Sequence, residues 1–347
     1  MKICNRKNAS IIAGLFLKGI NMNNNYIWKS KLGLDIKNFI ALKKANGFLY
    51  NAEEYQLTRF DSLCYKHKNM DSTVLTRELV EQWSKQLPNE SKNTRNYRVS
   101  YVRVFANYLL AIGKEAYIPV AKGSYVKSLV YVPSFKEVEM FFNVVDNYKS
   151  IKDYENRERF ELIYPVLFRL LYCCGLRNSE GSFLKRKLID LKKGIITIIK
   201  SKGQKDRIVY IASDLLKLCK EYDARMNRLV PNREYFFPGG VENKPITRAT
   251  VAIRFHKFWS IAFPKWSNRW PTPHSLRHGF VVRRMTLWIQ EGIDLNVMMP
   301  YLSKYLGHSN PQETYYYYHH MESIFPIIKH LDKHSQFIIP EVPYYEK

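Results

Sequence analysis

The sequence predicts a mainly α-helical protein with a small β-sheet, organised as a helical N-terminal domain followed by a mostly helical domain that carries the sheet. The chain has 347 residues, and at about 150 residues per domain this length favours two domains. Apolar residues recur at intervals of three and four along most of the chain, which is the period of a helix. Two β-branched runs, 194–200 and 207–211, flank a short polar segment, as the strands of a hairpin do.

The composition is that of a folded protein with a strong positive charge. Hydrophobic residues make up 46% and charged residues 25% of the chain, which excludes disorder, collagen and low complexity for most of its length. The 55 lysines and arginines outnumber the 31 aspartates and glutamates, which gives a net charge of +24. A polyanionic partner is the simplest reason to tolerate that self-repulsion, and nucleic acid is the usual one. Charge alone does not separate DNA from RNA or from anionic lipid.

Cysteine usage and the N-terminus indicate a cytoplasmic protein. The five cysteines include no Cys-x-x-Cys pair that could hold zinc, so buried free thiols in a reducing compartment are expected. No apolar run reaches the roughly 18 residues that a membrane span requires. Residues 1–25 faintly resemble a signal peptide, but the apolar stretch is short and no A-x-A cleavage site follows. We expect residues 1–25 to be a disordered or spurious extension, with Met22 as an alternative start.

Residues 26–115 are expected to form the helical N-terminal domain. Asn51 and Glu54 have the spacing of a capping box, which predicts a helix that begins there. Gly113 follows an amphipathic segment and predicts the end of the last helix of this domain. The expected helices lie around 36–44, from 51 to about 64, at 76–87 and at 91–112.

Four basic side chains fall close to one face of the expected helix at 91–112. A stripe of this kind is most often a solvated surface, but the large positive charge of the chain makes phosphate binding an equal alternative. The candidate contacts to nucleic-acid phosphates are Lys92, Arg95, Arg98 and Arg103.

The second domain follows a linker. Residues 116–131 show no strong periodicity and are expected to join the two domains. Ser134 and Glu137 form another capping-box pattern, which predicts the first helix of a domain that spans 132–332. Its expected elements are a helix to residue 146, a helix over 158–174, the hairpin and further helices, before a C-terminal tail at 333–347.

Four segments of the second domain combine polar residues in an unusual way. They are residues 175–180 (GLRNSE), 201–207 (SKGQKDR), 274–278 (HSLRH) and 306–319 (LGHSNPQETYYYYH). Each is weak alone. Arg177 could simply pair with Glu180, Lys202 could be a surface lysine, and the tyrosine run could alternate between core and surface.

Together the four segments describe a site for an anion. His274 and Arg277 are three residues apart, which places them on the same face of a helix. With His278 they put two imidazoles and a guanidinium within about one turn. A metal is less suited to this cluster because no carboxylate or cysteine joins it. In a strongly basic chain, the set predicts a metal-free site for a phosphodiester.

The order of these segments resembles the phage integrase family of tyrosine recombinases. An arginine, a lysine, a His-x-x-Arg box, a Leu-Gly-His segment and a tyrosine nine residues beyond that histidine follow one another in family order. The resemblance extends from about residue 28 to residue 330. It implies a SAM-like core-binding domain at 26–115 and, at 132–332, an α/β catalytic domain with the DNA breaking-rejoining fold.

The resemblance assigns six catalytic residues by position. In the family the arginines bind the scissile phosphate, the lysine protonates the leaving 5′-oxygen, and the tyrosine is the nucleophile. A spacing of nine from His308 selects Tyr317, and register alone excludes the neighbouring Tyr316 and Tyr318. The implied catalytic set is Arg177, Lys202, His274, Arg277, His308 and Tyr317.

The resemblance also implies the reaction and the partners. A site-specific recombinase of this kind cuts and rejoins double-stranded DNA through a 3′-phosphotyrosyl intermediate, with no metal or other cofactor and no membrane partner. The basic stripe at 92–103 is then a DNA-binding surface. Family members act as homotetramers on two synapsed sites and exchange a C-terminal element, for which residues 324–331 are the candidate. A related recombinase as second partner stays open, as does the setting, a mobile element or chromosome or plasmid resolution.

Two other functions remain open at this stage. One is a type IB-like topoisomerase, which has a similar site and relaxes supercoils as a monomer. The other is a DNA-binding accessory factor that has lost catalysis. The two-domain size and the His308 to Tyr317 spacing favour the recombinase over the topoisomerase. None of the six positions is altered, which disfavours the accessory factor.

Overall fold

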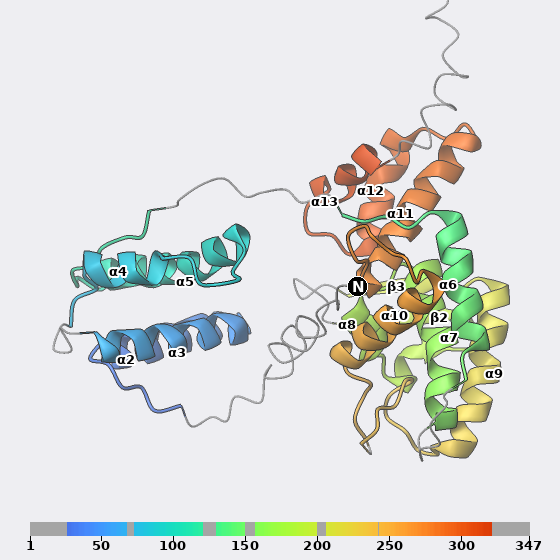
Figure 1. Ribbon diagram of the computed structural model, residues 1–347, viewed down its shortest axis with the longest axis horizontal. Helices are drawn as coiled ribbons and strands as arrows, with labels where there is room; N and C mark the ends of the chain where they lie inside the picture. The colour runs from blue at the N-terminus through green and yellow to red at the C-terminus, as the bar shows by residue number, and fades with distance from the viewer. Residues whose placement is uncertain are drawn as a thin grey trace, which may run out of the picture. The chain divides into compact units, whose positions relative to one another are not determined.

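The computed structural model describes residues 26–67, 73–120, 130–149, 157–199, 206–241 and 243–320 of the chain, with the backbone alone at 319 and 320. The chain divides into two compact units, Met1–Leu129 and Val130–Lys347 (Figure 1). In the described part of the chain, no helix is long and apolar enough to cross a membrane. Four expectations lie outside the described residues: those for 1–25, Lys202, 324–331 and the tail at 333–347.

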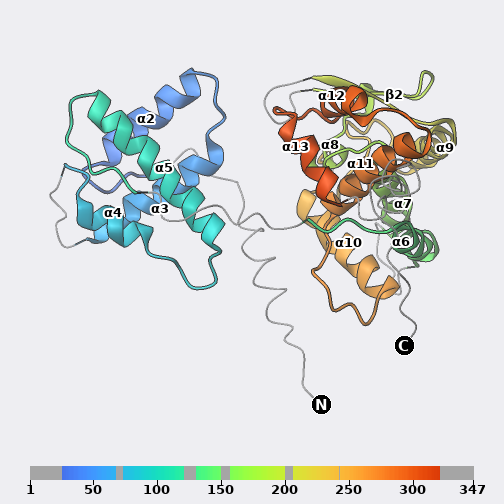
Figure 2. The same ribbon diagram turned by 90° about the horizontal axis from the view of Figure 1, so that it is seen from above.

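The described part of the first unit is a bundle of four helices. The last of them, α5, packs against each of the other three (Figure 2). Aromatic rings from several helices meet in the core, where the Phe60 and Trp83 rings lie 5.2 Å apart and the Phe39 and Phe105 rings 5.5 Å apart. The helices are α2 (Gly33–Ala45), α3 (Asn51–Lys66), α4 (Arg77–Ser84) and α5 (Lys92–Ala111).

The predicted ends of the last helix of this unit are confirmed. The Ser91 hydroxyl caps α5 by accepting from the backbone N–H of Thr94 over 3.1 Å. Gly113 follows the helix with a left-handed φ of 77°, a conformation that glycine adopts without strain. Helix α4 is shorter than predicted, since it ends at Ser84 instead of continuing to Leu87.

The predicted capping box at Asn51 is wrong. Asn51 is itself the first helical residue of α3, and the preceding Tyr50 is the N-cap residue, with a φ of 50° and no side-chain cap. Because Asn51 already has helical backbone angles, its side chain cannot fold back over the first turn as a capping side chain does. Glu54 instead accepts a hydrogen bond from Lys44 on α2 over 2.6 Å.

The second unit is built around helix α7. This helix packs against α6, α8, α9 and α11, and it is buried along most of its length from Ile163 to Tyr172. Gly181 lets α8 approach it closely, because an added Cβ would meet the Leu167 and Leu171 side chains at about 3 Å. The helices are α6 (Phe135–Asn147), α7 (Arg157–Cys173), α8 (Asn178–Ser182), α9 (Ser213–Leu229), α10 (Arg248–Ala262), α11 (Pro273–Gln290), α12 (Leu295–Leu306) and α13 (Gln312–Tyr315), with 3₁₀ turns η1 (Arg186–Leu188) and η2 (Tyr316–His320).

A small antiparallel sheet completes the second unit. The predicted hairpin is present as β2 (Ile195–Ile198) and β3 (Arg207–Tyr210), in which Ile196 lies opposite Val209. A third strand, β1 (Ile189–Asp190), pairs with β2 and is too short to give a sequence signal. The mainly helical architecture with one small sheet is therefore confirmed.

The predicted capping box at the start of the second domain is also confirmed. The Ser134 hydroxyl accepts from the backbone N–H of Glu137, and the Glu137 carboxylate accepts from the backbone N–H of Ser134 over 2.7 Å. The carboxylate also accepts from the Tyr131 hydroxyl over 2.6 Å. These bonds fix the point at which the chain enters the second unit.

Candidate active site

Arg177 lies where the chain leaves α7 and enters α8. Gly175 makes this turn with a left-handed φ of 62°, and an added Cβ would meet the Phe280 ring at 2.6 Å, so no larger residue fits. The Arg177 guanidinium donates to the carbonyl oxygen of Gly307 over 2.8 Å. Glu180 accepts from the backbone N–H and from the guanidinium of Arg177, each over 2.8 Å. The ion pair with Glu180 that the sequence left open therefore exists, and it orients Arg177.

The Glu180 carboxylate also binds an arginine that the sequence analysis did not assign to the site. Arg207, the first residue of β3, donates from its two terminal nitrogens to the two oxygens of Glu180, over 2.8 and 2.7 Å. Both side chains are buried, at 7% and 5% exposure. Arg207 stands in one of the four unusual segments, but its partner is 27 residues away in the sequence, which no local pattern reveals.

Arg277, on α11, is the most deeply buried cation of the site, at 1% exposure. Its guanidinium donates to the carbonyl oxygens of Gly175 and Leu306, over 2.6 and 2.8 Å. These two carbonyls follow α7 and end α12, so Arg277 joins three helices. A lysine has no planar fork of donors with which to make the same bonds.

His308 connects Arg277 to the segment that carries the tyrosines. Its Nε2 lies 3.1 Å from an Arg277 nitrogen and its Nδ1 lies 2.7 Å from the Thr314 hydroxyl. Because a guanidinium can only donate, Nε2 is the acceptor of the first bond. The neutral ring then carries its proton on Nδ1 and donates it to Thr314. Both ring nitrogens of His308 are therefore engaged in holding the site together.

The site carries excess positive charge. The guanidiniums of Arg177 and Arg207 bond the Glu180 carboxylate, and an Arg277 nitrogen lies 3.9 Å from the same carboxylate. Burial, followed by repulsion from Arg177, lowers the pKa of Arg277 to about 10. Arg277 still carries its charge at pH 7, and the Glu180 carboxylate contacts all three guanidiniums. Such a cluster is stabilised by an anion that enters it.

Tyr317 is the buried member of the tyrosine run, at 4% exposure. Its hydroxyl lies 2.6 Å from Nδ1 of His278 on α11. Burial raises the pKa of Tyr317 to about 12, although Arg277 and Arg177 act in the opposite direction. The sequence analysis did not assign His278 to the catalytic set, because the position next to Arg277 carries no signal about a tyrosine 39 residues further on.

The neighbouring tyrosines have other surroundings. The Tyr316 hydroxyl accepts from the backbone N–H of Val130 over 3.3 Å. Tyr318 is 36% exposed and stacks on Tyr315 with ring centroids 5.9 Å apart. The Tyr317 hydroxyl, in contrast, bonds to His278 on the helix that carries Arg277.

The two remaining candidates, His274 and Lys202, differ from the residues above. His274 lies one turn before His278 on α11 and is exposed, with the two imidazole rings edge to face at 4.6 Å. His274 and Arg277 are three residues apart on α11, as expected, but His274 lies in the first turn and is exposed while Arg277 is buried. Lys202 is outside the described residues. The structure thus brings Arg177, Arg277 and His308 into one hydrogen-bonded group, with Tyr317 beside it.

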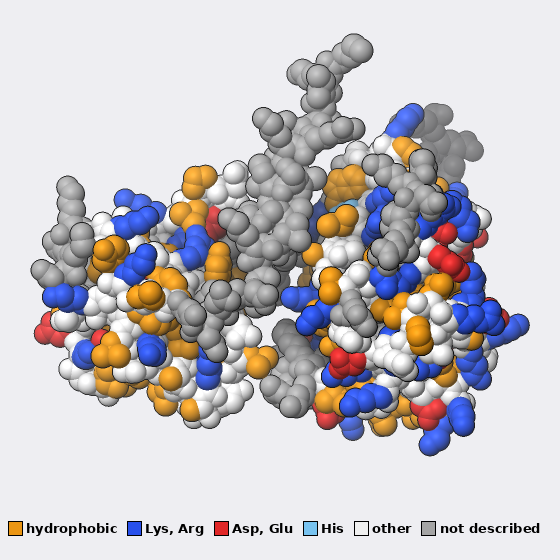
Figure 3. All heavy atoms as spheres, turned by 90° about the horizontal axis from the view of Figure 1, so that it is seen from below, with side chains coloured by type: hydrophobic (Ala, Val, Ile, Leu, Met, Phe, Trp, Pro, Cys, Tyr) orange, Lys and Arg blue, Asp and Glu red, His pale blue; other side chains and the backbone are white. Residues whose placement is uncertain are grey.

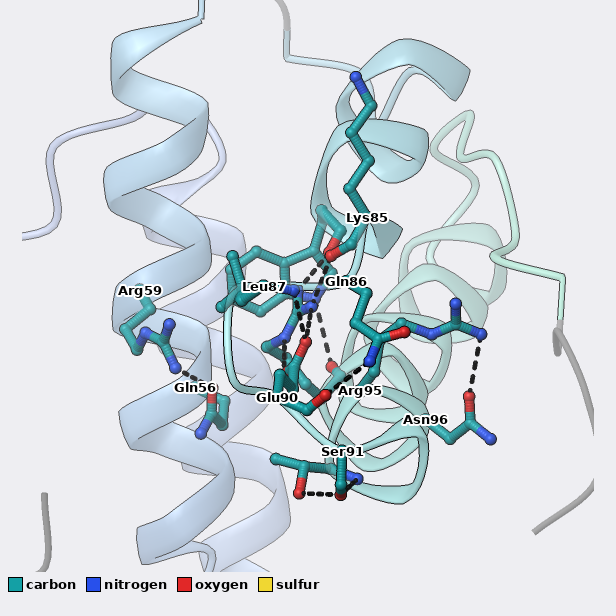
Figure 4. Close-up of polar contacts among 12 residues, drawn as sticks. Gln56, Arg59, Lys85, Gln86, Leu87, Glu90, Ser91, Arg95 and Asn96 are labelled. Atoms are coloured by element: carbon teal, nitrogen blue, oxygen red, sulfur yellow. Dashed lines mark hydrogen bonds and ion pairs between the residues drawn. The ribbon is translucent and has the colours of Figure 1, made fainter. Parts of the chain in front are cut away.

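The basic stripe of the first unit is only partly a surface, and for Arg98 the DNA-binding prediction is wrong. Arg98 is 3% exposed and donates to both carboxylate oxygens of Glu90 over 2.8 Å. It also donates to the carbonyl oxygens of Trp83 and Lys85, so it fastens the turn between α4 and α5 from inside. Figure 4 shows Glu90 and Lys85 on this turn. A guanidinium that bonds this many protein groups in the core cannot contact a phosphate backbone.

The other three members of the stripe differ among themselves. Lys92 is exposed at the first position of α5. Arg95 is half-buried and donates to the side chain of Asn96 over 3.3 Å (Figure 4). Arg103 is half-buried and donates to the Pro119 carbonyl oxygen over 2.8 Å.

Comparisons with known proteins agree on one family. The sequence profile of the phage integrase family matches residues 143–323, more than half of the chain. The integrase/recombinase y4rE of Sinorhizobium fredii is 33% identical over 160 residues, 45% of this chain and 50% of that protein. The tyrosine recombinase XerA of Pyrococcus furiosus is 26% identical over 284 residues, 72% of this chain and 91% of that protein.

The fold agrees with this family. The structure of the site-specific recombinase XerH bound to its difH substrate after cleavage aligns with a TM-score of 0.61 and 19% identity, over 86% of this chain and 84% of that one. The match of the family profile covers α7 to η2 and therefore includes Arg177, Arg277, His308 and Tyr317. The chain therefore belongs to the phage integrase family, and it is a tyrosine recombinase, an enzyme of site-specific DNA recombination.

Proposed function

We propose that this recombinase cuts and rejoins double-stranded DNA through a 3′-phosphotyrosyl link to Tyr317. The observation that carries the assignment is the position of the buried Tyr317 hydroxyl, which bonds to the helix of Arg277 beside a cluster of three arginines. A tyrosine next to surplus positive charge suits attack on a phosphodiester, whose transition state gains negative charge.

Arg177 and Arg277 would bind the non-bridging oxygens of the scissile phosphate. The buried positive charge of this pair, which the Glu180 carboxylate also contacts, favours an anionic guest. Guanidinium groups bind such oxygens in a bidentate manner that a lysine cannot reproduce. The groups are already ordered by protein carbonyls, so little reorganisation accompanies the reaction.

The remaining members of the set would handle protons and orientation. As the Tyr317 oxygen forms its bond to phosphorus, the bond from phosphorus to the 5′-oxygen breaks. Lys202 would donate a proton to that leaving oxygen, a general-acid role. His274 would add a hydrogen bond at the phosphate, and His308 would hold the Arg277 guanidinium in place through its Nε2. A 5′-hydroxyl from a second duplex then reverses the step, so one phosphodiester replaces another without ATP or a metal cofactor.

The two units would share the binding of DNA. We propose the first unit, residues 26–115, as the core-binding domain, with 116–131 as linker and 132–332 as catalytic domain. Lys and Arg side chains are spread over the face of the second unit drawn on the right in Figure 3, with acidic side chains in smaller groups. The net charge of +24 supports a polyanionic partner. Because cellular DNA is the substrate, the cytoplasm is the proposed location.

Recombination joins two duplexes, so we propose a homotetramer on two synapsed sites. The residues proposed for exchange between protomers, 324–331, lie outside the described residues. A second, related recombinase as partner is the alternative assembly. Size measurements on synapsed complexes with this protein alone distinguish the two.

Covalent trapping tests the proposed reaction. Nicked duplexes that tile the DNA flanking the protein's own gene are incubated with the protein, and adducts stable in SDS are counted. We expect an adduct at a 3′ end that disappears in Tyr317→Phe and persists in the matched control Tyr318→Phe. An adduct that survives Tyr317→Phe would assign the nucleophile to another residue.

A further inference from the structure

His278 is a buried histidine in direct contact with the proposed nucleophile, and the family resemblance gives it no role. It is 8% exposed, and its Nδ1 lies 2.6 Å from the Tyr317 hydroxyl oxygen. The next residue, Gly279, packs closely against α7, since a Cβ added there would lie 3.2 Å from the Tyr172 ring. The helix is therefore fixed against α7 at this point, and the imidazole has a defined place.

The other two histidines of the site are less suited to take the proton of Tyr317. His308 uses Nε2 to accept from Arg277 and Nδ1 to donate to Thr314, so its acceptor nitrogen is already engaged. His274 is exposed, and its ring packs edge to face against the His278 ring with centroids 4.6 Å apart. His278 is the histidine whose bond to the Tyr317 hydroxyl is observed.

We propose that His278 is a catalytic residue that accepts the proton of the Tyr317 hydroxyl during cleavage and returns it during rejoining. The proposal rests on the proposed function, because it concerns the same nucleophile. It requires the tautomer in which Nδ1 of His278 carries no proton and the Tyr317 O–H donates to it.

The proton balance of the step is complete. The Tyr317 O–H bond breaks as the bond from its oxygen to phosphorus forms, and the proton moves to Nδ1, which leaves His278 as an imidazolium. The leaving 5′-oxygen takes a different proton, from the general acid. In rejoining, the tyrosine oxygen leaves phosphorus and takes the proton back from His278. No oxidant, metal or further reactant enters.

The surroundings of Tyr317 explain why such an acceptor is needed. Burial holds the pKa of Tyr317 at about 12, so almost none of the phenol is ionised at pH 7. Arg277 and Arg177 favour the phenolate but do not overcome burial. A base in contact with the hydroxyl can accept its proton as the phenol oxygen bonds to phosphorus, because the O–H group becomes more acidic as that bond forms.

Two substitutions separate proton transfer from positioning. His278→Asn keeps a hydrogen-bond acceptor close to the place of Nδ1 but cannot take a proton at pH 7, while His278→Phe removes both functions. The readout is the single-turnover rate of adduct formation on the nicked duplex that traps the wild-type protein. We expect His278→Asn to slow the rate by about 10² to 10⁴-fold, the usual range for general base catalysis.

The matched control is His256→Asn on α10, a half-buried histidine outside the site. We expect it to leave the rate within about twofold of wild type. A wild-type rate in His278→Asn overturns the proposal. If the wild-type protein forms no adduct on any duplex, the proposed function itself fails, and this outcome is distinct from selective loss in His278→Asn.

A fluorinated nucleophile gives a readout that a merely structural role would not change. Fluorination of Tyr317, introduced as an unnatural amino acid, lowers the pKa of the phenol and reduces its need for a base. We expect the gap in rate between wild type and His278→Asn to shrink by at least tenfold on that background. A gap of the same size with both phenols overturns the proposal.

The tautomer can be tested without DNA. Nitrogen-15 NMR of the full-length protein with labelled histidine reports which ring nitrogen of each histidine carries the proton, and loss of a signal in His278→Asn assigns it. We expect an unprotonated Nδ1 on His278 at neutral pH, and a shift of that signal in Tyr317→Phe. A protonated Nδ1 would contradict the proposal even if no recombination site had been found.

Discussion

At the scale of single residues, the site depends on one carboxylate that serves several arginines. Glu180 is 5% exposed and bonds Arg177 and Arg207. Removing one partner of a buried ionic group leaves uncompensated charge, which costs about 3–5 kcal/mol. We expect Glu180→Gln to lower the free energy of unfolding by an amount in this range, measured by urea denaturation.

The control for Glu180→Gln is Glu234→Gln. Glu234 forms an exposed ion pair with Lys185, with the two side chains 47% and 40% exposed. Ion pairs between exposed side chains contribute little to stability because solvent screens them, so this variant is expected to unfold nearly as wild type does. Equal losses in the two variants would show that Glu180 does not hold the arginine cluster.

The buried phenol of Tyr317 predicts a dependence of stability on alkaline pH. Burial raises the pKa of Tyr317 to about 12, above the ordinary value of about 10. Its contribution to stability is therefore fully present below pH 10 and is lost as the pH rises through 12. We expect the urea midpoint to fall less steeply over this interval in Tyr317→Phe than in wild type. Identical slopes would contradict the burial of this hydroxyl.

Residue order along the chain was enough to select the residues of the proposed site, but not to predict the contacts among them. The spacing from His308 selected Tyr317, and the structure brings this hydroxyl beside the arginines. The partnership with His278 was not predictable, because it spans 39 residues and depends on how η2 packs on α11. The stripe pattern likewise placed Arg98 on the surface, because its buried ion pair with Glu90 depends on how the turn between α4 and α5 folds back on the helix.

At the scale of elements, the end of α12 supplies a test of close packing at the site. Gly307 has a φ of 66°, and an added Cβ would lie 3.2 Å from the Arg207 guanidinium and 3.6 Å from that of Arg177. We expect Gly307→Ala to lose stability from backbone strain, about 1–2 kcal/mol, and to reduce adduct formation at least tenfold because the Arg207 guanidinium, which shares Glu180 with Arg177, must shift. The measurements are urea unfolding and the trapping rate.

Gly292 provides the matched control for this glycine. It follows α11 with a φ of 71°, and nothing lies within 4 Å of an added Cβ. Gly292→Ala should therefore lose stability through backbone strain alone, and its rate of adduct trapping should stay close to that of wild type. Equal trapping in the two variants would mean that Gly307 is required only for its backbone conformation.

Helix α5 allows a comparison between an exposed and a buried cation of the same stripe. We expect Lys92→Gln to change stability by less than about 0.5 kcal/mol and to reduce the salt slope of DNA binding by about one. Arg98→Met leaves Glu90 unpaired in the core and should cost about 3–5 kcal/mol. Urea unfolding and filter binding to a duplex oligonucleotide measure both effects. A clear loss of stability in Lys92→Gln would contradict the assignment of Lys92 to the surface and Arg98 to the core.

The elements themselves were largely predictable where a local signal defines them. The capping box at Ser134 and the glycine after α5 act within one turn, so their sequence patterns were sufficient. Asn51 matched the same pattern and failed, because Tyr50 had already taken the capping position with a left-handed backbone. A two-residue strand such as β1 forms only through its pairing with β2, which no local pattern records.

At the scale of the whole molecule, the net charge of +24 predicts strongly salt-dependent binding to DNA of any sequence. Each phosphate that the protein neutralises releases counterions, and several such contacts lower affinity by about 10³-fold or more between about 50 and 200 mM salt. We expect this loss for a duplex without any recombination site, measured by fluorescence anisotropy. Affinity that changes less than tenfold over this interval would contradict DNA binding through phosphate contacts.

The central claim is that Tyr317 attacks DNA from a site built by Arg177, Arg277, His308 and their partners. The most direct measurement isolates the covalent adduct, digests its DNA and protein, and locates the attached nucleotide by tandem mass spectrometry. The account predicts a nucleotide linked through its 3′-phosphate to Tyr317. A nucleotide on Tyr315, Tyr316 or Tyr318, or a link through a 5′-phosphate, would contradict it.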